Sequence, residues 1–170
     1  SLDVVIESGP FGETCGDALP ISGSGTYSGS TAGAVGDYSP TTGCPDVTGA
    51  SGADHVYVVT LSPGDNLSAT LDMPDQDAAL YAATDCGSIA STCVAGSDSA
   101  GTGLTESINF ASPAGGTYYI FVDGYWSYSE GAYDLDIEIS QASTGATLYF
   151  YENVDYATYI GTHELLVGPG

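Results

Sequence analysis

The chain has 170 residues, of which none is Lys or Arg and 22 are Asp or Glu, giving a net charge of −22. Nucleic acids and anionic lipid surfaces are bound through Lys and Arg, so both classes of partner are excluded. Arg clamps on charged substrates are excluded for the same reason. Because like charges repel, a compact fold needs neutralisation from outside the chain, and Ca²⁺ suits carboxylate and carbonyl oxygens best.

Other readings of the acidity are selection for solubility, for resistance to trypsin-like cleavage, or for a salt-rich setting. The chain nevertheless has the apolar residues of a folded domain, at 42% of the total with 13 Tyr. No run of 18 apolar residues is present, so no membrane insertion is expected. A first residue of Ser rather than Met suggests a processed mature chain.

In chain order, period-two alternation and short turn signals predict strands throughout, whereas helical periodicity is nearly absent. This pattern predicts an all-β fold, an antiparallel β-sandwich with extra terminal strands. Residues 22–36 are either a weakly patterned strand or an exposed loop. We expect an N-terminal extension at 1–14, the sandwich at 15–139 and a C-terminal β extension at 140–170. The predicted strands are Leu2–Glu7, His55–Leu61, Leu67–Leu71, Ala78–Thr84, Glu106–Ala111, Thr117–Val122, Ala132–Ile139, Ala146–Tyr151 and Ala157–Val167.

Four cysteines, Cys15, Cys44, Cys86 and Cys93, lack the spacing of a zinc site. An even number in a small acidic chain predicts two disulfides and an extracellular or cell-surface location. Three pairings are possible. The short segment between Cys86 and Cys93 favours these two as partners, which leaves Cys15 with Cys44.

A set of spaced motifs lies within residues 54–139. These are Asp54-His-Val-Tyr57, Leu61-Ser-Pro-Gly64, Asp77-Ala-Ala-Leu-Tyr81, Gly116-Thr-Tyr-Tyr-Ile-Phe-Val-Asp123 and Gly131-Ala-Tyr133-Asp-Leu. They resemble the bacterial pre-peptidase C-terminal (PPC) domain, in a cysteine-containing variant. The resemblance implies a jelly-roll-like β-sandwich that serves as an accessory domain of secreted enzymes and binds Ca²⁺ in some members. The chain departs from the family in having no attached peptidase, no basic residues and strand-like ends.

Carboxylates gather in the predicted turns, which favours calcium as a cofactor because loops rich in Asp and carbonyls supply its flexible oxygen shell. No EF-hand spacing is present, so the ligands would come from separate loops. For any single Asp, the alternative is a residue that caps its own turn. The candidate metal ligands are Asp77, Asp98, Glu106 and Asp123, followed by Asp54, Asp75 and Asp37.

The sequence has neither a Gly-x-Ser-x-Gly elbow nor a His-Glu-x-x-His motif, so we expect that the protein is not an enzyme. The aromatic loop Tyr125-Trp126-Ser-Tyr128 has three readings, namely packing over the end of the sandwich, contact with a protein and contact with a glycan.

The strand-like ends suggest self-assembly, because an exposed strand can complete the sheet of a neighbour. Leu2, Val4 and Ile6 would then form an interface, and head-to-tail addition would give a homopolymer. The alternative is that these segments pair within their own subunit. We therefore predict a Ca²⁺-stabilised, secreted structural subunit of an extracellular filament or surface layer. The competing hypothesis is a free-standing carbohydrate- or protein-binding accessory module of a secreted hydrolase.

Overall fold

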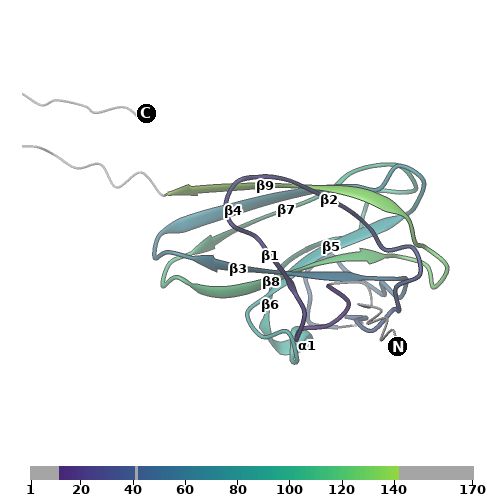
Figure 1. Cartoon of the computed structure of the whole chain (residues 1–170). Coiled ribbons are helices and arrows are strands. Elements are labelled where there is room, and N and C mark those ends of the chain that lie inside the picture. The colour runs from purple at the N-terminus through teal and green to yellow at the C-terminus, as the bar shows by residue number, and fades with distance from the viewer. Residues whose placement is uncertain (1–11, 41, 142–170) are drawn as a thin grey trace, which may run out of the picture.

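A computed structural model describes residues 12–40 and 42–141, which form a β-sandwich of two sheets (Figure 1). Sheet A has the strand order β1-β3-β8-β5-β6, and sheet B the order β2-β9-β4-β7. All neighbours are antiparallel except β1 and β3, so the predicted antiparallel sandwich is confirmed. The elements are β1 (Leu19–Pro20), β2 (Gly25–Ser30), β3 (His55–Leu61), β4 (Asp65–Asp72), β5 (Ala78–Ala83), α1 (Ile89–Thr92), β6 (Cys93–Ser97), β7 (Glu106–Ser112), β8 (Gly116–Gly124) and β9 (Ala132–Gln141).

The six strands predicted between residues 55 and 139 correspond to β3, β4, β5, β7, β8 and β9. The ambiguous stretch 22–36 contains β2, while β1, α1 and β6 were not predicted. β6 reads Cys-Val-Ala-Gly-Ser, and its small residues hide any alternation. It becomes a strand through its pairing with β5, so tertiary context decides it. The predicted strands at residues 2–7, 146–151 and 157–167 lie outside the described residues.

The main core lies between the two sheets, where each strand directs alternate apolar side chains inward. Its fully buried members include Leu67, Leu71, Leu80, Ile120 and Leu135, which come from β4, β5, β8 and β9. In β4 and β9 the alternation is regular, so one face of sheet B packs on the core and the other meets solvent. No helix among the described residues is long and apolar enough to cross a membrane.

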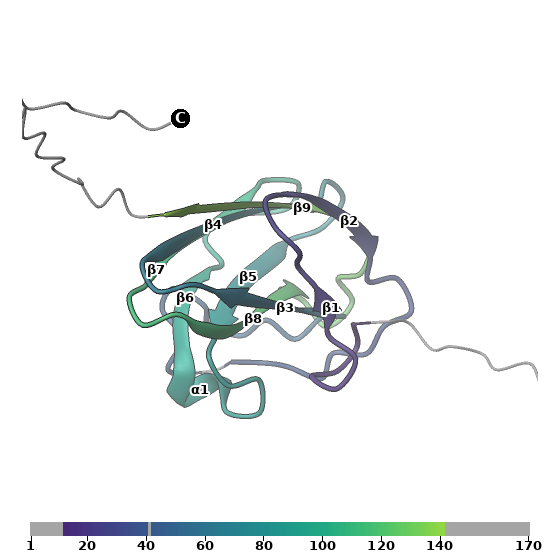
Figure 2. The same ribbon diagram turned by 60° about the vertical axis from the view of Figure 1, so that its left-hand side comes forward.

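The outer face of sheet A is apolar as well, and it is buried under chain that forms no strand. All six residues of β5 are buried, and Val56, Tyr81 and Phe121 belong to a second apolar cluster on this face. The cover comes from residues 12–18, from the long connection between β2 and β3, and from α1, which lies on the side of sheet A away from sheet B (Figure 2). Tyr38 packs edge-on against Phe121, with 5.1 Å between the ring centroids.

Two disulfides fasten this cover, and their pairing differs from the one predicted. Cys15 bonds to Cys86, 71 residues away, and Cys44 bonds to Cys93, 49 residues away. The prediction that Cys86 pairs with Cys93 is wrong, as is the pairing of Cys15 with Cys44. Nearness in sequence does not decide the pairing, because α1 separates Cys86 from Cys93 and each faces a different covering segment.

Two glycines allow the cover to approach sheet A closely. A Cβ atom on Gly96 of β6 would lie 2.4 Å from the carbonyl oxygen of Pro45. Gly43 has φ +82° and lies against α1, where an added Cβ would be 1.8 Å from the carbonyl oxygen of Ala90. Only a residue without a side chain fits either position, so the path of residues 43–47 depends on both.

The outer face of sheet B is polar and carries carboxylates opposite hydroxyl groups. Thr26 lies across from Asp136, and Ser28 across from Asp134, and both hydroxyls donate to the facing carboxylate. Elsewhere Thr14, Tyr81 and Ser97 donate to carboxylates in the same way. In the described part of the chain, hydroxyls and backbone N–H groups therefore take the place that Lys and Arg hold in ordinary proteins.

Candidate functional site

Two buried carboxyl groups face each other beneath the cover of sheet A. Asp54 immediately precedes β3, and Asp123 is the penultimate residue of β8. β3 and β8 are antiparallel with His55 opposite Val122, and continuing that register sets Asp54 opposite Asp123. Neither side chain is exposed to solvent. Directly opposed residues share a face, so the pair is held on the outer side of sheet A.

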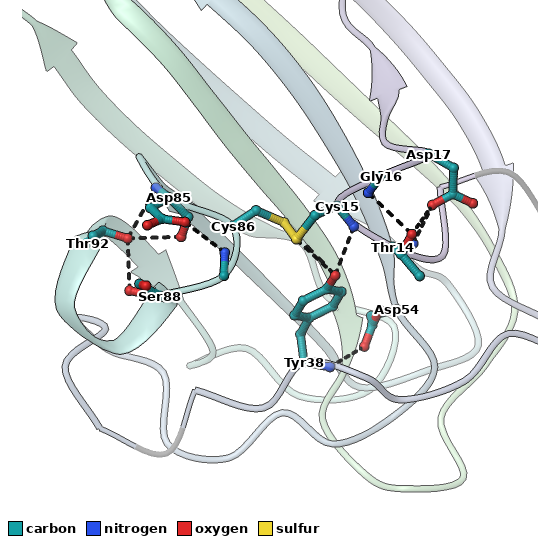
Figure 3. Close-up of a disulfide and its surroundings, with 11 residues drawn as sticks. Thr14, Cys15, Gly16, Asp17, Tyr38, Asp54, Asp85, Cys86, Ser88 and Thr92 are labelled. Carbon is teal, nitrogen blue, oxygen red and sulfur yellow. Dashed lines mark hydrogen bonds between the residues drawn. A yellow bond between two sulfur atoms is a disulfide. The ribbon is translucent and has the colours of Figure 1, made fainter.

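Asp54 holds the long connection between β2 and β3 against the start of β3 (Figure 3). Its Oδ2 accepts hydrogen bonds from the backbone N–H groups of Asp37 at 2.8 Å and Tyr38 at 2.9 Å. Its Oδ1 is buried and has no hydrogen-bond partner among the described residues. Burial raises the pKa of Asp54 to about 7, although the two N–H groups oppose this change. Near neutral pH the group is therefore close to the midpoint of its titration.

The two carboxylate oxygens of Asp123 differ in their hydrogen bonds. The Tyr81 hydroxyl donates to its Oδ2 at 2.8 Å, whereas its Oδ1 is buried and has no partner in the part of the chain that the structure describes. Burial raises the pKa of Asp123 well above its ordinary value; the Tyr81 hydrogen bond lowers it, and the charge of Asp54 raises it further. Two carboxyl groups so placed either keep a proton or attract a cation.

Tyr38 joins the carboxyl pair to the first disulfide. Figure 3 shows its ring extending from the backbone that bonds Asp54 to the bridge between Cys15 and Cys86. The Tyr38 hydroxyl accepts a hydrogen bond from the backbone N–H of Cys15 at 2.9 Å. Burial raises the pKa of this hydroxyl, so it stays protonated and neutral. The disulfide, Tyr38 and Asp54 thus hold one piece of backbone in place.

A second group of predicted ligands lies where β6 and β7 adjoin the start of β5. Glu106 is buried and already satisfied, since Ser97 donates to one carboxylate oxygen and the N–H of Ala100 to the other at 2.7 Å. Burial raises the pKa of Asp98, the N–H of Thr48 lowers it, and the charges of Glu106 and Asp77 raise it. Asp75 is exposed in the turn after β4.

The predicted ligands therefore divide into two groups. Within residues 12–40 and 42–141, no three His, Cys, Asp or Glu side chains converge in a way that would hold a metal. Among the seven predicted ligands, only Asp54 and Asp123 combine full burial with an oxygen that accepts no hydrogen bond from the described residues. Binding of Ca²⁺ at the predicted residues stays a prediction, and these two groups are its strongest candidates.

The aromatic loop follows Asp123 at the end of β8. Trp126 and Tyr128 are 49% and 74% exposed, with nearly parallel rings whose centroids are 6.3 Å apart. Tyr125 packs edge-on against Trp126 at 4.7 Å and is half-buried. The backbone N–H of Tyr125 donates to the carbonyl of Asp77, which anchors the loop while the other two rings face solvent. The three predicted interface residues Leu2, Val4 and Ile6 lie outside the described residues.

Residues 53–124 match the sequence model of the bacterial pre-peptidase C-terminal domain. The resemblance inferred from the motifs is confirmed. The matched segment runs from β3 to the end of β8, so Asp54 and Asp123 lie at its two limits. β1, β2 and β9 complete the sandwich outside it.

Two solved structures are similar in fold. One is the pre-peptidase C-terminal domain of a collagenase from Bacillus anthracis, at 17% identity with a TM-score of 0.48, covering 71% of this chain and 94% of that one. The other is a periplasmic inhibitor of g-type lysozyme from Aeromonas hydrophila, at 14% identity with a TM-score of 0.49, covering 72% and 96%. No curated protein matches the chain.

Tyr81 and Tyr38 are the site residues that the sequence analysis missed. Tyr81 stands in a strand with no exposed residue, and a Tyr hydroxyl buried there requires a hydrogen-bond partner, so the motif Ala-Ala-Leu-Tyr carried a usable signal. Tyr38 carried no such signal, because its position depends on the disulfide and on the path of the long connection.

Proposed function

We propose that the chain is a non-enzymatic, exported protein in which Ca²⁺ stabilises the sandwich and terminal strands join neighbouring copies into a filament or surface layer. The observation that carries the proposal is the facing pair Asp54 and Asp123, each with one buried oxygen that receives no hydrogen bond. In a chain of net charge −22, such a pair is a natural place for a cation.

Ca²⁺ takes six to eight oxygen ligands and accepts carboxylates, carbonyls and water together. Asp54 and Asp123 would supply the charged ligands. Ser129 is a further candidate, because its hydroxyl is buried without a partner and its side chain lies against Gly124, the residue after Asp123. A bound Ca²⁺ would offset the repulsion between the two carboxylates and fasten the cover to sheet A.

Export is supported by the two disulfides, which persist in oxidising compartments such as the cell exterior. The outer edge of β7, which pairs with no strand within residues 12–40 and 42–141, supports strand addition. This strand lies at the end of sheet B, and its outward residues Ser107, Asn109 and Ala111 carry no charge. Charged residues, prolines and bulges normally protect such edges, and the seven residues of β7 contain no charged outward side chain and no proline. A terminal strand such as Leu2–Glu7 would fit there by β-augmentation.

The Ca²⁺ hypothesis is tested by thermal and urea unfolding of the full chain with Ca²⁺ and with a chelator. We expect Ca²⁺ at about 100 times its Kd to stabilise the protein by about 2.7 kcal/mol. The double variant Asp54→Asn, Asp123→Asn should lose this response. The double variant Asp134→Asn, Asp136→Asn removes the same charge from the outer face of sheet B and should keep it. An equal response of both variants would contradict a site at Asp54 and Asp123.

Assembly is tested by light scattering and electron microscopy of the same samples. Polymers should form with Ca²⁺, come apart in chelator, and be absent when Leu2–Glu7 is deleted. A strict monomer at high concentration with Ca²⁺ present would contradict assembly and would leave the Ca²⁺ site to be judged by the unfolding experiment.

A second candidate function is a binding module of a secreted hydrolase, which the exposed rings of Trp126 and Tyr128 favour. It predicts loss of glycan or peptide affinity in Trp126→Ala in a protein that forms no polymer.

A further inference from the structure

The two ends of the sandwich differ in what they expose. We use the name loop end for residues 31–37, 72–77, 98–105 and 124–131, which lie where β3, β5, β7 and β9 begin and β4 and β8 end. Four of the five large apolar side chains exposed in the described part of the chain belong to it. They are Val35, Leu104, Trp126 and Tyr128. The turns at 62–64 and 113–115, at the opposite end (Figure 1), contribute none.

Hydrogen bonds join the four segments of the loop end into one surface. The N–H of Thr31 donates to the carbonyl of Gly131 at 2.9 Å, and the N–H of Gly103 to that of Gln76 at 2.9 Å. Glu130 accepts from the N–H of Gly33 at 3.0 Å. The N–H of Tyr125 donates to the carbonyl of Asp77 at 2.9 Å and so links these two pairs of segments. The exposed side chains are therefore presented on a shared support rather than on independent loops.

Exposed carboxylates occur in the same segments as the exposed rings. Asp37, Asp72, Asp75 and Glu130 are all exposed at the loop end. The chain has no Lys or Arg that could pair with them. Aromatic faces attract cations, and carboxylates bind guanidinium groups through paired hydrogen bonds, so both features of this surface favour one kind of ligand. An anionic partner would be repelled.

We propose that the loop end binds a basic protein surface whose Arg side chains stack on Trp126 and Tyr128 and pair with the carboxylates of the loop end. The parallel arrangement of the two rings, with 4° between their planes, suits a planar guanidinium better than the compact ammonium group of Lys. Tyr, Trp and Arg are also the residues that dominate binding energy at protein interfaces. The inference gives a partner class to the binding-module function and depends on neither Ca²⁺ nor the terminal strands.

Trp126 is the sole tryptophan of the chain, so its fluorescence reports on this surface without any label. The full chain is titrated in chelator and about 0.15 M salt, where the screening length is about 8 Å, with a synthetic Gly/Ser peptide that carries four Arg residues. A peptide with four Lys residues matches its charge, and one with four citrulline residues matches its shape. Neutral cello- and chito-oligosaccharides serve as glycan probes.

We expect the Arg peptide to change the Trp126 emission, to protect it from acrylamide quenching, and to bind more tightly than the Lys peptide. Tyr128→Ala should weaken this binding about tenfold, equivalent to about 1.4 kcal/mol, while keeping the reporter. Val94→Ala, which alters the exposed apolar residue of β6, should leave the affinity unchanged.

Equal binding of the Arg and Lys peptides without protection of Trp126 would overturn the proposal, because it would indicate general attraction to an acidic protein. Equal weakening by Tyr128→Ala and Val94→Ala would overturn it as well. Protection of Trp126 by a neutral oligosaccharide but not by the Arg peptide would assign the surface to glycans instead. None of these results depends on the response of unfolding to Ca²⁺ or on polymer formation.

Discussion

The outer faces of the two sheets differ in how they meet their surroundings. Sheet B follows the usual pattern of an antiparallel sheet, with its outer face polar and exposed to solvent. On sheet A, Val56, Tyr81 and Phe121 make the outer face apolar, and irregular chain covers it. Irregular chain has few regular backbone hydrogen bonds of its own, so disulfides and buried carboxylates hold it. The disulfides and the buried carboxylates of this protein are therefore needed because the apolar outer face of sheet A must be covered.

The carboxylates of the two faces differ accordingly. Asp134 and Asp136 are exposed on sheet B, where hydroxyls on the neighbouring strand bond them and water surrounds them. Asp54 and Asp123 are buried on sheet A, and each has one oxygen without a donor. Carboxylates of the first kind cost little to keep ionised, whereas those of the second kind are poised to take up a proton or a cation.

The largest loss of stability should come from removing a disulfide that holds the cover of sheet A. The double variant Cys15→Ala, Cys86→Ala removes a cross-link between residues 71 apart. We expect a loss of about 4 kcal/mol in the free energy of unfolding, because the unfolded chain regains the freedom that the loop had lost. Urea denaturation followed by circular dichroism measures it. A loss below about 1 kcal/mol would mean that the cover is held mainly by its other contacts.

The second largest effect should be a change in the free energy of unfolding with pH, measured in the presence of a chelator. The native pKa of Asp54 is about 7, against an ordinary value of 3.8, so the native state binds more protons than the unfolded state between these pH values. Its stabilising contribution is complete below pH 3.8, falls as the pH rises and is lost above about 7. Asp54 should contribute a slope of up to about 1.4 kcal/mol per pH unit. Asp54→Asn should remove this part of the slope, while Asp123, whose pKa is also raised by burial, keeps its own part.

Asp136→Asn on sheet B is the matched control and should leave this slope unchanged. Saturating Ca²⁺ should reverse the trend, because a bound cation requires ionised carboxylates. A wild-type stability that rises from pH 4 to 7 in chelator would contradict the assignment to Asp54.

The smallest effects compare one hydroxyl–carboxylate bond from each face. Tyr81→Phe leaves the buried Asp123 without its donor and should cost about 1–3 kcal/mol. Thr26→Val removes the bond to the exposed Asp136 and should change the free energy of unfolding by less than about 0.5 kcal/mol, because water replaces the hydroxyl. Equal costs in urea denaturation would show that burial does not separate the two faces.

The sandwich and most of its strands could be predicted from the sequence. Alternate residues of β4, β7 and β9 are buried, so their period-two pattern was visible in the sequence, and the motifs between Asp54 and Asp123 predicted the resemblance to the pre-peptidase C-terminal domain. The absence of Lys and Arg likewise determined that carboxylates must find donors other than ammonium or guanidinium groups. These properties depend on composition or on residues close together in the chain, so they can be predicted from the sequence.

Three features could not be predicted from the sequence: the disulfide pairing, the strand β6, and which two of the seven candidate carboxylates are buried opposite each other. Each depends on contacts between residues far apart in the chain. Cys15 meets Cys86 because the cover crosses sheet A, and Asp54 meets Asp123 because β3 pairs with β8 in one register. Burial, which raises the pKa values of both carboxyl groups, comes from segments that no local pattern connects to them.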